Sequence, residues 1–166
     1  MQAAPHIRLA TRDDLGVING IYNHYVAHST CTYQTDPETM AAREAWFGSR
    51  DPKVHPITVI EASGEILGWA SLSPYHSRCG YRSTVEDSVY LRHDLLGRGM
   101  GRALLTDLCE RARSIGHHTI IAGVSAEQEG SVVLHEKLGF VRVAHLREVG
   151  YKFGRWLDVI YLQRMI

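Results

Sequence analysis

Three glycines at alternate positions, Gly97, Gly99 and Gly101, form the stretch of this sequence best suited to binding a ligand. Glycine has no Cβ atom, so a backbone built from it can approach a ligand closely. The stretch follows a pattern typical of a strand, 85–91, and precedes one typical of a helix, 100–115. The first N–H groups of a helix have no internal partner and lie at its positive end. The arrangement therefore predicts a phosphate-binding turn.

The residues between the glycines decide which phosphate ligand fits. Arg98 and Arg102 add positive charge, and Met100 lies between them. The dinucleotide fingerprint G-x-G-x-x-G does not match, because the third glycine comes one place early. A nucleoside-triphosphate loop needs Gly-Lys-Ser/Thr, which is absent from this stretch. A different phosphate ligand is expected, and a glycine-rich turn without a ligand is the alternative.

Hydrophobic periodicity indicates the elements that must position this turn. It predicts strands at 7–10, 57–62, 66–72, 85–91, 119–124, 140–144 and 156–162, and helices at 13–28, 36–50, 100–115 and 131–138. This order fits an α/β (α+β) fold, with a mixed central β-sheet and helices on both faces. The length of 166 residues suits a single domain, 1–166.

Local signals refine these elements. Thr11 is expected to cap the first helix, and Asp36 the second, where a proline at the first position supports the start. Trp46, Trp69 and Trp156 are expected in the core. The hydroxyl-rich segment 29–34 either lines a polar pocket or forms a surface loop. The segment 73–83 combines aromatic and basic side chains and is too polar for a core strand.

Composition excludes several classes of function. Eighteen basic and eighteen acidic side chains cancel, so no overall field attracts nucleic acid or an anionic membrane. The ten histidines are scattered without zinc spacing, so no metal is expected. Three widely separated cysteines favour a reducing compartment. No apolar run approaches the ~20 residues of a membrane span, and no signal-peptide core begins the sequence. A cytoplasmic protein is expected.

Four segments together resemble a known family. The x-G-x-G-x-G turn is similar to the pyrophosphate loop of the GNAT N-acetyltransferases, and residues 131–140, SVVLHEKLGF, resemble their short helix running into "EKLGF". Residues 84–90, TVEDSVY, and 150–158, GYKFGRWLD, resemble segments of the phosphinothricin and methionine sulfoximine acetyltransferases. The likeness covers nearly the whole chain and implies the GNAT fold.

The resemblance implies acetyl-coenzyme A as co-substrate. Its pyrophosphate is expected at residues 97–102, mainly on backbone N–H groups. A backbone N–H among Val89, Tyr90 and Leu91 is expected to bind the thioester carbonyl. Gln128 occurs where the family commonly has an asparagine, and its amide is expected to bond the pantetheine arm.

The resemblance also implies a reaction that needs a base. A thioester is attacked by a neutral amine, whereas an amino-acid α-amine is mostly protonated near pH 7. Glu86 is the candidate base, on the strand face opposite Val89, and an exposed glutamate in a salt bridge is the alternative. Asp87 is expected to point to the other face. His135, where many family members have tyrosine, is the candidate acid for the departing thiolate, and a packing histidine is the alternative. No covalent nucleophile is expected.

The acceptor pocket is expected to combine Tyr33, Tyr75, His76, Arg78 and Arg82. A guanidinium can bind a carboxylate through two parallel hydrogen bonds. Relatives often have Trp and a basic residue where this chain has Tyr75-His76, so His76 binds a carboxylate only when protonated, or Arg78 or Arg82 takes over. Because Arg82 lies four residues before Glu86, the two are expected on one face of an extended chain. Solvated loop charges are the alternative.

These inferences predict an enzyme that transfers acetyl from acetyl-coenzyme A to the α-amine of a small amino-acid-like substrate, directly and in a ternary complex. Phosphinothricin and methionine sulfoximine or sulfone are the acceptors that the resemblance implies. A peptide, protein or polyamine acceptor is one alternative, and a non-catalytic acetyl-coenzyme A sensor is another. The subgroup is usually dimeric, so a homodimer is expected, with Lys152, Phe153 and Trp156 as candidates for the subunit contact.

Overall fold

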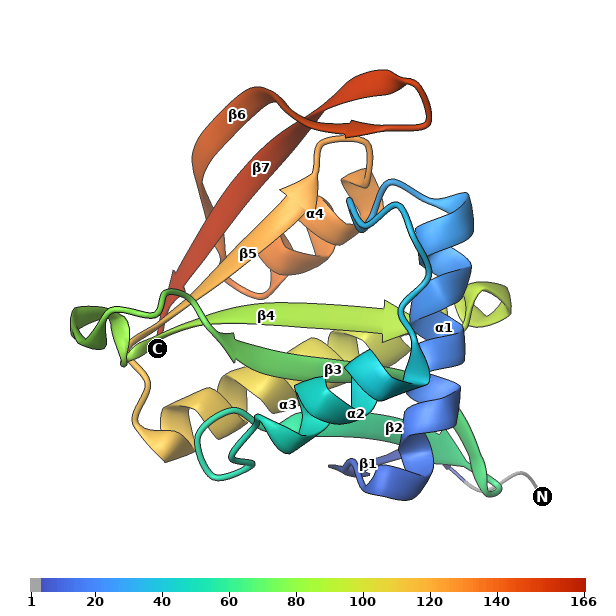
Figure 1. Cartoon of the computed structure of the whole chain (residues 1–166). Coiled ribbons are helices and arrows are strands. Elements are labelled where there is room, and N and C mark those ends of the chain that lie inside the picture. Colours follow the sequence, from blue (N-terminus) through green and yellow to red (C-terminus); the bar gives the residue numbers. More distant parts are fainter. Residues whose placement is uncertain (1–3) are drawn as a thin grey trace.

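The computed structural model describes residues 4–166 and has one seven-stranded sheet, in the order β1-β2-β3-β4-β5-β7-β6 (Figure 1). The strands are β1 (His6–Leu9), β2 (Ile57–Ala62), β3 (Glu65–Pro74), β4 (Thr84–Leu91), β5 (Thr119–Ser125), β6 (Val141–Lys152) and β7 (Arg155–Met165). The helices are α1 (Leu15–His28), α2 (Met40–Gly48), α3 (Met100–Ile115) and α4 (Glu129–Lys137), with short 3-10 turns η1 (Arg12–Asp14), η2 (Cys79–Tyr81) and η3 (His93–Leu95). The predicted mixed sheet and order of elements are confirmed.

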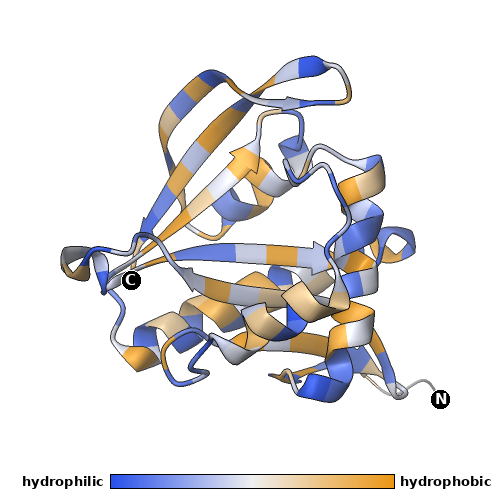
Figure 2. Cartoon of the chain, in the orientation of Figure 1, coloured by the Kyte–Doolittle hydropathy of each residue, from blue (hydrophilic) through white to orange (hydrophobic). Residues whose placement is uncertain are grey.

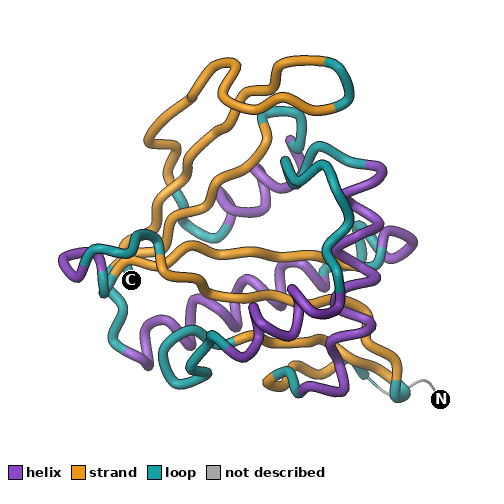
Figure 3. Tube along the Cα trace, in the orientation of Figure 1, coloured by secondary structure: helices purple, strands orange, loops and turns teal. Residues whose placement is uncertain are grey.

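The sheet divides between β4 and β5, which form the one parallel pair among the described strands. Their pairing runs only from Thr84 opposite Thr119 to Glu86 opposite Ile121. Beyond this point β4 continues against β3, and β5 against β7. The two strands therefore diverge toward their carboxyl ends, as the tube in Figure 3 shows.

Helices cover both faces of the sheet. The helix α3 buries Leu104, Leu105 and Leu108 completely against one face, beside residues of α4. The helices α1 and α2 pack on the other face, around Ile18 and Trp69. Each fully buried leucine contributes roughly 1.5–3 kcal/mol. Hydrophobic residues accordingly follow the central strands and recur along α3 in Figure 2.

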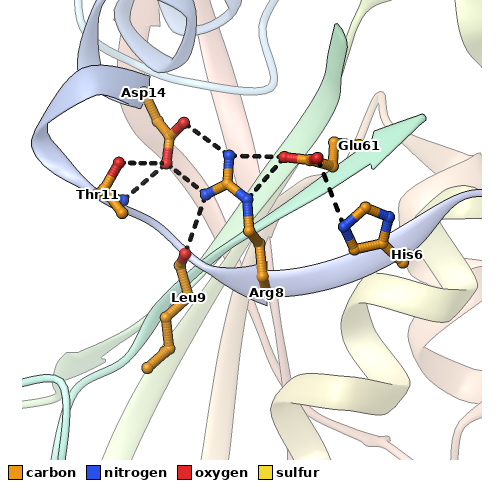
Figure 4. Close-up of polar contacts among 6 residues, drawn as sticks. All are labelled: His6, Arg8, Leu9, Thr11, Asp14 and Glu61. Carbon is orange, nitrogen blue, oxygen red and sulfur yellow. Dashed lines mark hydrogen bonds and ion pairs between the residues drawn. The ribbon is translucent and has the colours of Figure 1, made fainter. Parts of the chain in front are cut away.

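An ion network fixes the first strand to the first helix (Figure 4). The guanidinium of Arg8 donates to Asp14 at 2.7 and 2.9 Å and to Glu61 at 2.6 Å. Thr11, the predicted cap, begins η1 and its backbone N–H donates to Asp14 at 2.7 Å. The hydrogen bond from Arg8 holds the pKa of the buried Asp14 below its ordinary value. Because η1 takes the first turn, α1 begins two residues later than predicted, at Leu15.

The predicted start of the second helix at Asp36 is wrong. The helix α2 begins at Met40, after Thr39, whose Oγ1 accepts a first-turn N–H at 3.1 Å. The preceding segment is held in place by α1, because the N–H of Glu38 donates to the side chain of Asn23 at 2.7 Å. A tertiary contact therefore overrides the local helix signal.

The last two strands differ most from prediction. β6 continues to residue 152, well beyond the predicted 140–144, and its residues are mostly exposed. Two register shifts against β7 interrupt its alternation, so the pattern is weak in sequence. Trp156, predicted in the core, is 61% exposed, whereas Lys152, a candidate for subunit contact, is only 3% exposed. Trp69 is buried as predicted, and Trp46 is half-buried against it.

Candidate functional site

A cleft of about 630 Å³ opens where β4 and β5 diverge. The two strands, α4, the glycine turn and the end of α1 contribute to its walls. It is lined by Tyr25, Cys31, residues 87–91, Leu96, Gly97, Gly99, Gly101, Arg102, residues 122–124, Gln128, and residues 130, 131, 133–135 and 137. This volume suits a small-molecule ligand.

The glycine turn forms one end of this cleft and depends on glycine at two positions. Gly97 and Gly99 have φ angles of +77° and +81°, which favour residues without a Cβ atom. Gly99 is the residue before α3 and makes no side-chain cap, so the first N–H groups of α3 have no side-chain acceptor there. Of the predicted phosphate contacts, the three glycines and Arg102 line the cleft. Arg98 is exposed outside the lining.

Two neighbours of the turn have packing roles. The side chain of Met100 is buried in the core under α3. A Cβ added at Gly101 would lie 3.5 Å from Leu134 and 3.6 Å from Leu91, an ordinary contact distance. Gly101 therefore accepts a small side chain, whereas Gly97 and Gly99 have open space but a positive φ that strains any residue with a Cβ atom.

The central strand contributes Val89, Tyr90 and Leu91 to the cleft, as predicted for its lining. Among the described residues, the edge of β4 that faces β5 has no strand partner beyond Glu86. Backbone groups there are available for a ligand, because buried N–H and C=O groups need partners. The hydroxyl of Tyr25 donates to the carbonyl of Leu91 at 2.7 Å and ties α1 to this strand. Burial raises the pKa of Tyr25 to about 12.

His135 and Asp87 form a buried pair between α4 and β4. The imidazole Nε2 lies 2.9 Å from Asp87 Oδ2, and Nδ1 lies 2.7 Å from the carbonyl of Ser131. Both partners are acceptors, so the geometry favours the doubly protonated ring. Burial alone lowers the pKa of His135, but the bond and charge of Asp87 and the Ser131 carbonyl outweigh it and raise the pKa above its ordinary value. With both nitrogens engaged, donation of a proton to a ligand requires that one bond breaks.

Glu86 lies on the face of β4 opposite Asp87 and Val89, as alternation predicts. It lies beside the cleft rather than in its lining. A Cβ added at Gly123, which does line the cleft, would lie 3.4 Å from Glu86 Oε1 and 3.4 Å from the ring of Tyr161. Glu86 and Tyr161 therefore meet over this glycine. Burial raises the pKa of Glu86, and the charge of Asp87 adds to the rise. Burial also raises the pKa of Tyr161.

The predicted acceptor residues of segment 75–82 lie on an exposed loop outside the cleft lining. Tyr75 packs edge-on against Tyr81, and the backbone N–H of Arg78 donates to His76 at 3.3 Å. The expectation that Arg82 shares an extended face with Glu86 is wrong, because Arg82 ends η2 in a helical conformation (φ −56°, ψ −25°). Alternation does not apply across that turn.

The segment 29–34 is a loop against the cleft. Tyr33 donates from its hydroxyl to the carbonyl of Asp158 at 2.6 Å. Gln128, predicted to bond the coenzyme, donates to the hydroxyls of Ser29 and Thr30 at 3.4 and 3.3 Å. Cys31 lines the cleft itself. Whether Tyr33 contacts a substrate stays a prediction.

Sequence reasoning missed Tyr25, Cys31, Asp87 and Tyr161 as site residues. Tyr25 lies within the predicted helix 13–28 and Tyr161 within the predicted strand 156–162, and neither pattern indicates a site. Alternation along β4 correctly turned Asp87 away from Glu86, but no sequence signal paired it with α4. Tertiary contacts alone bring these side chains together.

Neither a metal-binding cluster nor a membrane-spanning helix is found in the described part of the chain. Residues 4–166 contain no group of three His, Cys, Asp or Glu side chains arranged to hold a metal ion. Within the same residues, no helix combines the length and apolarity that crossing a membrane requires.

Comparison with known proteins identifies relatives of this chain. A profile described as "Acetyltransferase (GNAT) family" matches residues 18–140. The chain is 42% identical to the L-methionine sulfoximine/L-methionine sulfone acetyltransferase of Pseudomonas paraeruginosa, covering 95% of this chain and 92% of the relative. It is 40% identical to the L-amino acid N-acyltransferase MnaT of Escherichia coli, covering 95% and 91%.

A solved structure supports the same relationship. The fold matches the crystal structure of a GNAT superfamily phosphinothricin acetyltransferase from Sinorhizobium meliloti in complex with AcCoA, with a TM-score of 0.94. The two sequences are 33% identical, and the match covers 98% of this chain and 88% of the other.

Proposed function

The chain belongs to the acetyltransferase (GNAT) family, and we propose that it transfers acetyl from acetyl-coenzyme A to the α-amine of a small amino-acid-like compound. One observation carries this proposal. The cleft joins the uncapped N-terminus of α3 at one end to Gly123 at the other, and Glu86 lies beside that glycine. A helix N-terminus suited to a phosphate thus lies along the same cleft as a carboxylate beside its lining.

The residues present fit acetyl-coenzyme A. Backbone N–H groups at Gly99 and in the first turn of α3 bind the pyrophosphate, with Arg102 beside them. The unpaired edge of β4, at Val89, Tyr90 and Leu91, bonds the pantetheine and thioester end. The coenzyme supplies an acetyl group activated as a thioester. A solved relative that holds AcCoA supports this assignment.

Glu86 acts as the general base. A carboxylate with a raised pKa holds a proton from an ammonium group more readily than an ordinary one, and general bases work best with a pKa near the operating pH. Half-burial beside Gly123 raises the pKa of Glu86 in this direction. It removes the proton of the acceptor amine, directly or through one water, so that the neutral amine attacks.

Acceptor recognition falls to residues around Glu86. Tyr161 lies over the same glycine, and Ser73, at the start of segment 73–83, is paired with Glu86 across β3 and β4. We assign the acceptor's carboxylate to Arg78 or Arg82 on that segment, with His76 as a further cationic group when protonated. Methionine sulfoximine, methionine sulfone and phosphinothricin all carry an α-amine and an α-carboxylate, and the named relatives act on these compounds.

Free-thiol release tests the proposal. The protein is incubated with acetyl-coenzyme A and each of these amines, and the acetylated product is identified by mass. Omission of the amine and use of the Glu86→Gln variant are the controls. Thiol release that requires the amine supports the proposal. No release above the amine-free rate with any α-amino acid would contradict it.

We also propose that the protein is a cytoplasmic homodimer. Large apolar side chains lie exposed on β6, β7 and the turn between them, among them Val149, Tyr151, Phe153 and Trp156, each more than half exposed. Such surfaces on a sheet edge favour self-association. The three cysteines are free thiols, which suits a reducing compartment. A molar mass of one chain from light scattering would contradict the homodimer. Loss of activity in a cytoplasm-like reducing buffer would contradict the cytoplasmic location.

A further inference from the structure

The segment 150–158 lies outside the cleft, yet it bonds to a loop that lines it. Lys152 is the centre of this contact, because its side chain is 3% exposed. Its ammonium donates to the carbonyl of Ser29 at 2.7 Å and to the carbonyl of Thr32 at 2.8 Å. These two carbonyls flank Cys31, which lines the cleft. One cation of β6 therefore holds both sides of the turn that presents Cys31.

The same segment fixes the next residue of the loop. The ring of Tyr33 lies against Gly150 so closely that an added Cβ would be 2.4 Å from two ring atoms. The Tyr33 hydroxyl reaches past it and donates to the carbonyl of Asp158. Glycine is required at 150 because this ring occupies the space of a side chain. Tyr33 is thus held from both strands of the β6–β7 hairpin.

A third group of contacts closes the other end of the loop. Arg155 forms an ion pair with Glu127. Glu127 in turn accepts the hydroxyl of Thr30 at 3.0 Å. The loop from residue 29 to residue 34 is therefore attached at four positions, Ser29, Thr30, Thr32 and Tyr33, while its own hydroxyl-rich sequence has no periodic pattern to order it.

The charge on Lys152 costs free energy to bury. Burial lowers the pKa of Lys152, and among the described residues no carboxylate lies within ion-pair distance of its ammonium. A buried ammonium is tolerated only where hydrogen bonds compensate for lost water. Here both hydrogen bonds come from carbonyls of the loop, and the ring of Phe153 adds a cation–π contact at 5.0 Å. The loop conformation and the buried charge therefore depend on each other.

We propose that Lys152 is a positioning residue that holds loop 29–34 as the wall on the acceptor side of the cleft. This inference rests on the proposed acetyl transfer for its kinetic consequence, but not for its structural one. Lys152 does not touch the reacting atoms. It acts through Cys31, which lines the cleft, and through the nearby Tyr33, which the hairpin holds outside the lining. The coenzyme's phosphate end, at the glycine turn, is not part of this contact.

The reactivity of Cys31 reports on the loop. Burial raises the pKa of the Cys31 thiol and the charge of Lys152 opposes this rise, so removal of Lys152 alone would slow labelling, and faster labelling indicates that the loop has moved. The Cys79→Ser substitution removes the exposed thiol. The two remaining thiols are Cys31, which is half-buried, and Cys109, which is buried. Iodoacetamide labelling is followed by peptide mass spectrometry in this background, with and without Lys152→Met. Loss of both charged hydrogen bonds is expected to raise the labelling rate of Cys31 roughly tenfold, while Cys109 stays unlabelled. Unchanged labelling of Cys31 would overturn the proposal.

Kinetics separate a positioning role from a general loss of structure. For Lys152→Met, KM for the amine is expected to rise roughly tenfold, with kcat and the Kd for acetyl-coenzyme A changed less than about twofold. Arg147→Met is the matched control, because it removes one cation from an exposed position of the same strand. It should behave as wild type in both assays. An equal rise in the coenzyme Kd, or a rise in KM for Arg147→Met, would contradict the assignment.

A milder variant keeps the test valid if Lys152→Met does not fold. Tyr33→Phe removes only the bond to the Asp158 carbonyl and should raise Cys31 labelling by a smaller factor, about threefold. Wild-type labelling in this variant would then count against the proposal. If the wild type itself shows no amine-dependent turnover, the proposed function fails, and the labelling of Cys31 still decides the role of Lys152.

Discussion

The two ends of the cleft are built in opposite ways. The proposed phosphate end consists of adjacent residues, and the groups that we propose to bind phosphate are backbone N–H groups of the turn at 97–101 and of α3. The acceptor end gathers side chains from distant segments, such as Tyr33 on Asp158, 125 residues apart, and Lys152 on Ser29, 123 residues apart. One end depends on local backbone shape, and the other depends on the completed fold.

This difference predicts different sensitivities to substitution. Backbone N–H donors remain available after any side-chain substitution that neither occupies the space of the ligand nor makes the local electrostatic potential negative. The side chains at the acceptor end each have a separate role, so single conservative changes there should have specific effects. The following variants test that contrast, from the largest expected effect to the smallest.

Glu86→Gln should have the largest effect, because it removes the proposed base while it keeps the shape of the side chain. General-base catalysis contributes roughly 10²–10⁴-fold, so kcat should fall within that range at constant coenzyme affinity. Stopped-time product assays and calorimetry measure the two quantities. A variant with wild-type kcat would assign proton removal to another group and would weaken the claim that the acceptor end acts through individual side chains.

Gly101→Glu should affect the phosphate end nearly as strongly. Like-charge contact costs several kcal/mol, so the Kd for acetyl-coenzyme A should rise roughly a hundredfold or more. Gly101→Ala is the control, because an added Cβ meets neighbours only at ordinary contact distances and leaves the backbone donors unchanged. Calorimetry on folded protein compares the two. If alanine weakens binding as much as glutamate does, shape rather than charge governs this end.

Asp87→Asn should destabilise the wall shared by both ends. Removal of one partner from a buried pair costs about 3–5 kcal/mol, and the lower value is expected since the amide oxygen can still accept a bond. Because the pKa of His135 is raised in the folded protein, its contribution is fully present below about pH 6.5, the ordinary histidine value. It is lost as the pH rises through the higher folded value.

The urea midpoints of wild type and Asp87→Asn should therefore differ most at acidic pH and converge as the pH increases. His135→Gln in the same titration is the matched control, since it should remove the pH-dependent part. A stability difference that grows with pH would show that the doubly protonated ring is not the form in this pair.

Arg82→Ala should have the smallest effect. Loss of a charged hydrogen bond typically costs ~1.5–3 kcal/mol, but Arg82 is exposed on the loop, so a decrease near tenfold in kcat/KM for amino acids is expected. The matching amino-acid amide, which lacks the carboxylate, should be affected much less. Equal loss for acid and amide would remove Arg82 from recognition and leave Arg78 for the same test.

The sequence predicted the backbone of the glycine turn well because its signals are local. Alternate glycines between a strand pattern and a helix pattern specify a strand-turn-helix unit within about 30 residues, and the structure has it. Alternation along β4 also separated Glu86 from Asp87 correctly. These inferences needed only periods of 2 and 3.6 residues.

The rest could not be predicted for physical reasons. Asn23 moves the start of α2 to Met40 through a contact that local helix signals do not include. The 3-10 turn before β4 breaks the alternation that was assumed for Arg82. Lys152 is a lysine in an exposed edge strand, and only the neighbouring loop explains its burial. Each error arises where tertiary structure decides a local conformation.

The short parallel pairing of β4 with β5 has a consequence for the mechanics of the molecule. Only three residue pairs join the two halves of the sheet there, whereas the pairings on either side run along most of each strand. The junction is thus the most compliant line in the sheet, and amide hydrogen exchange should be fastest along the free edges beside it. A ligand that fills the cleft between β4 and β5 stiffens this junction. The melting temperature then rises with ligand concentration by mass action.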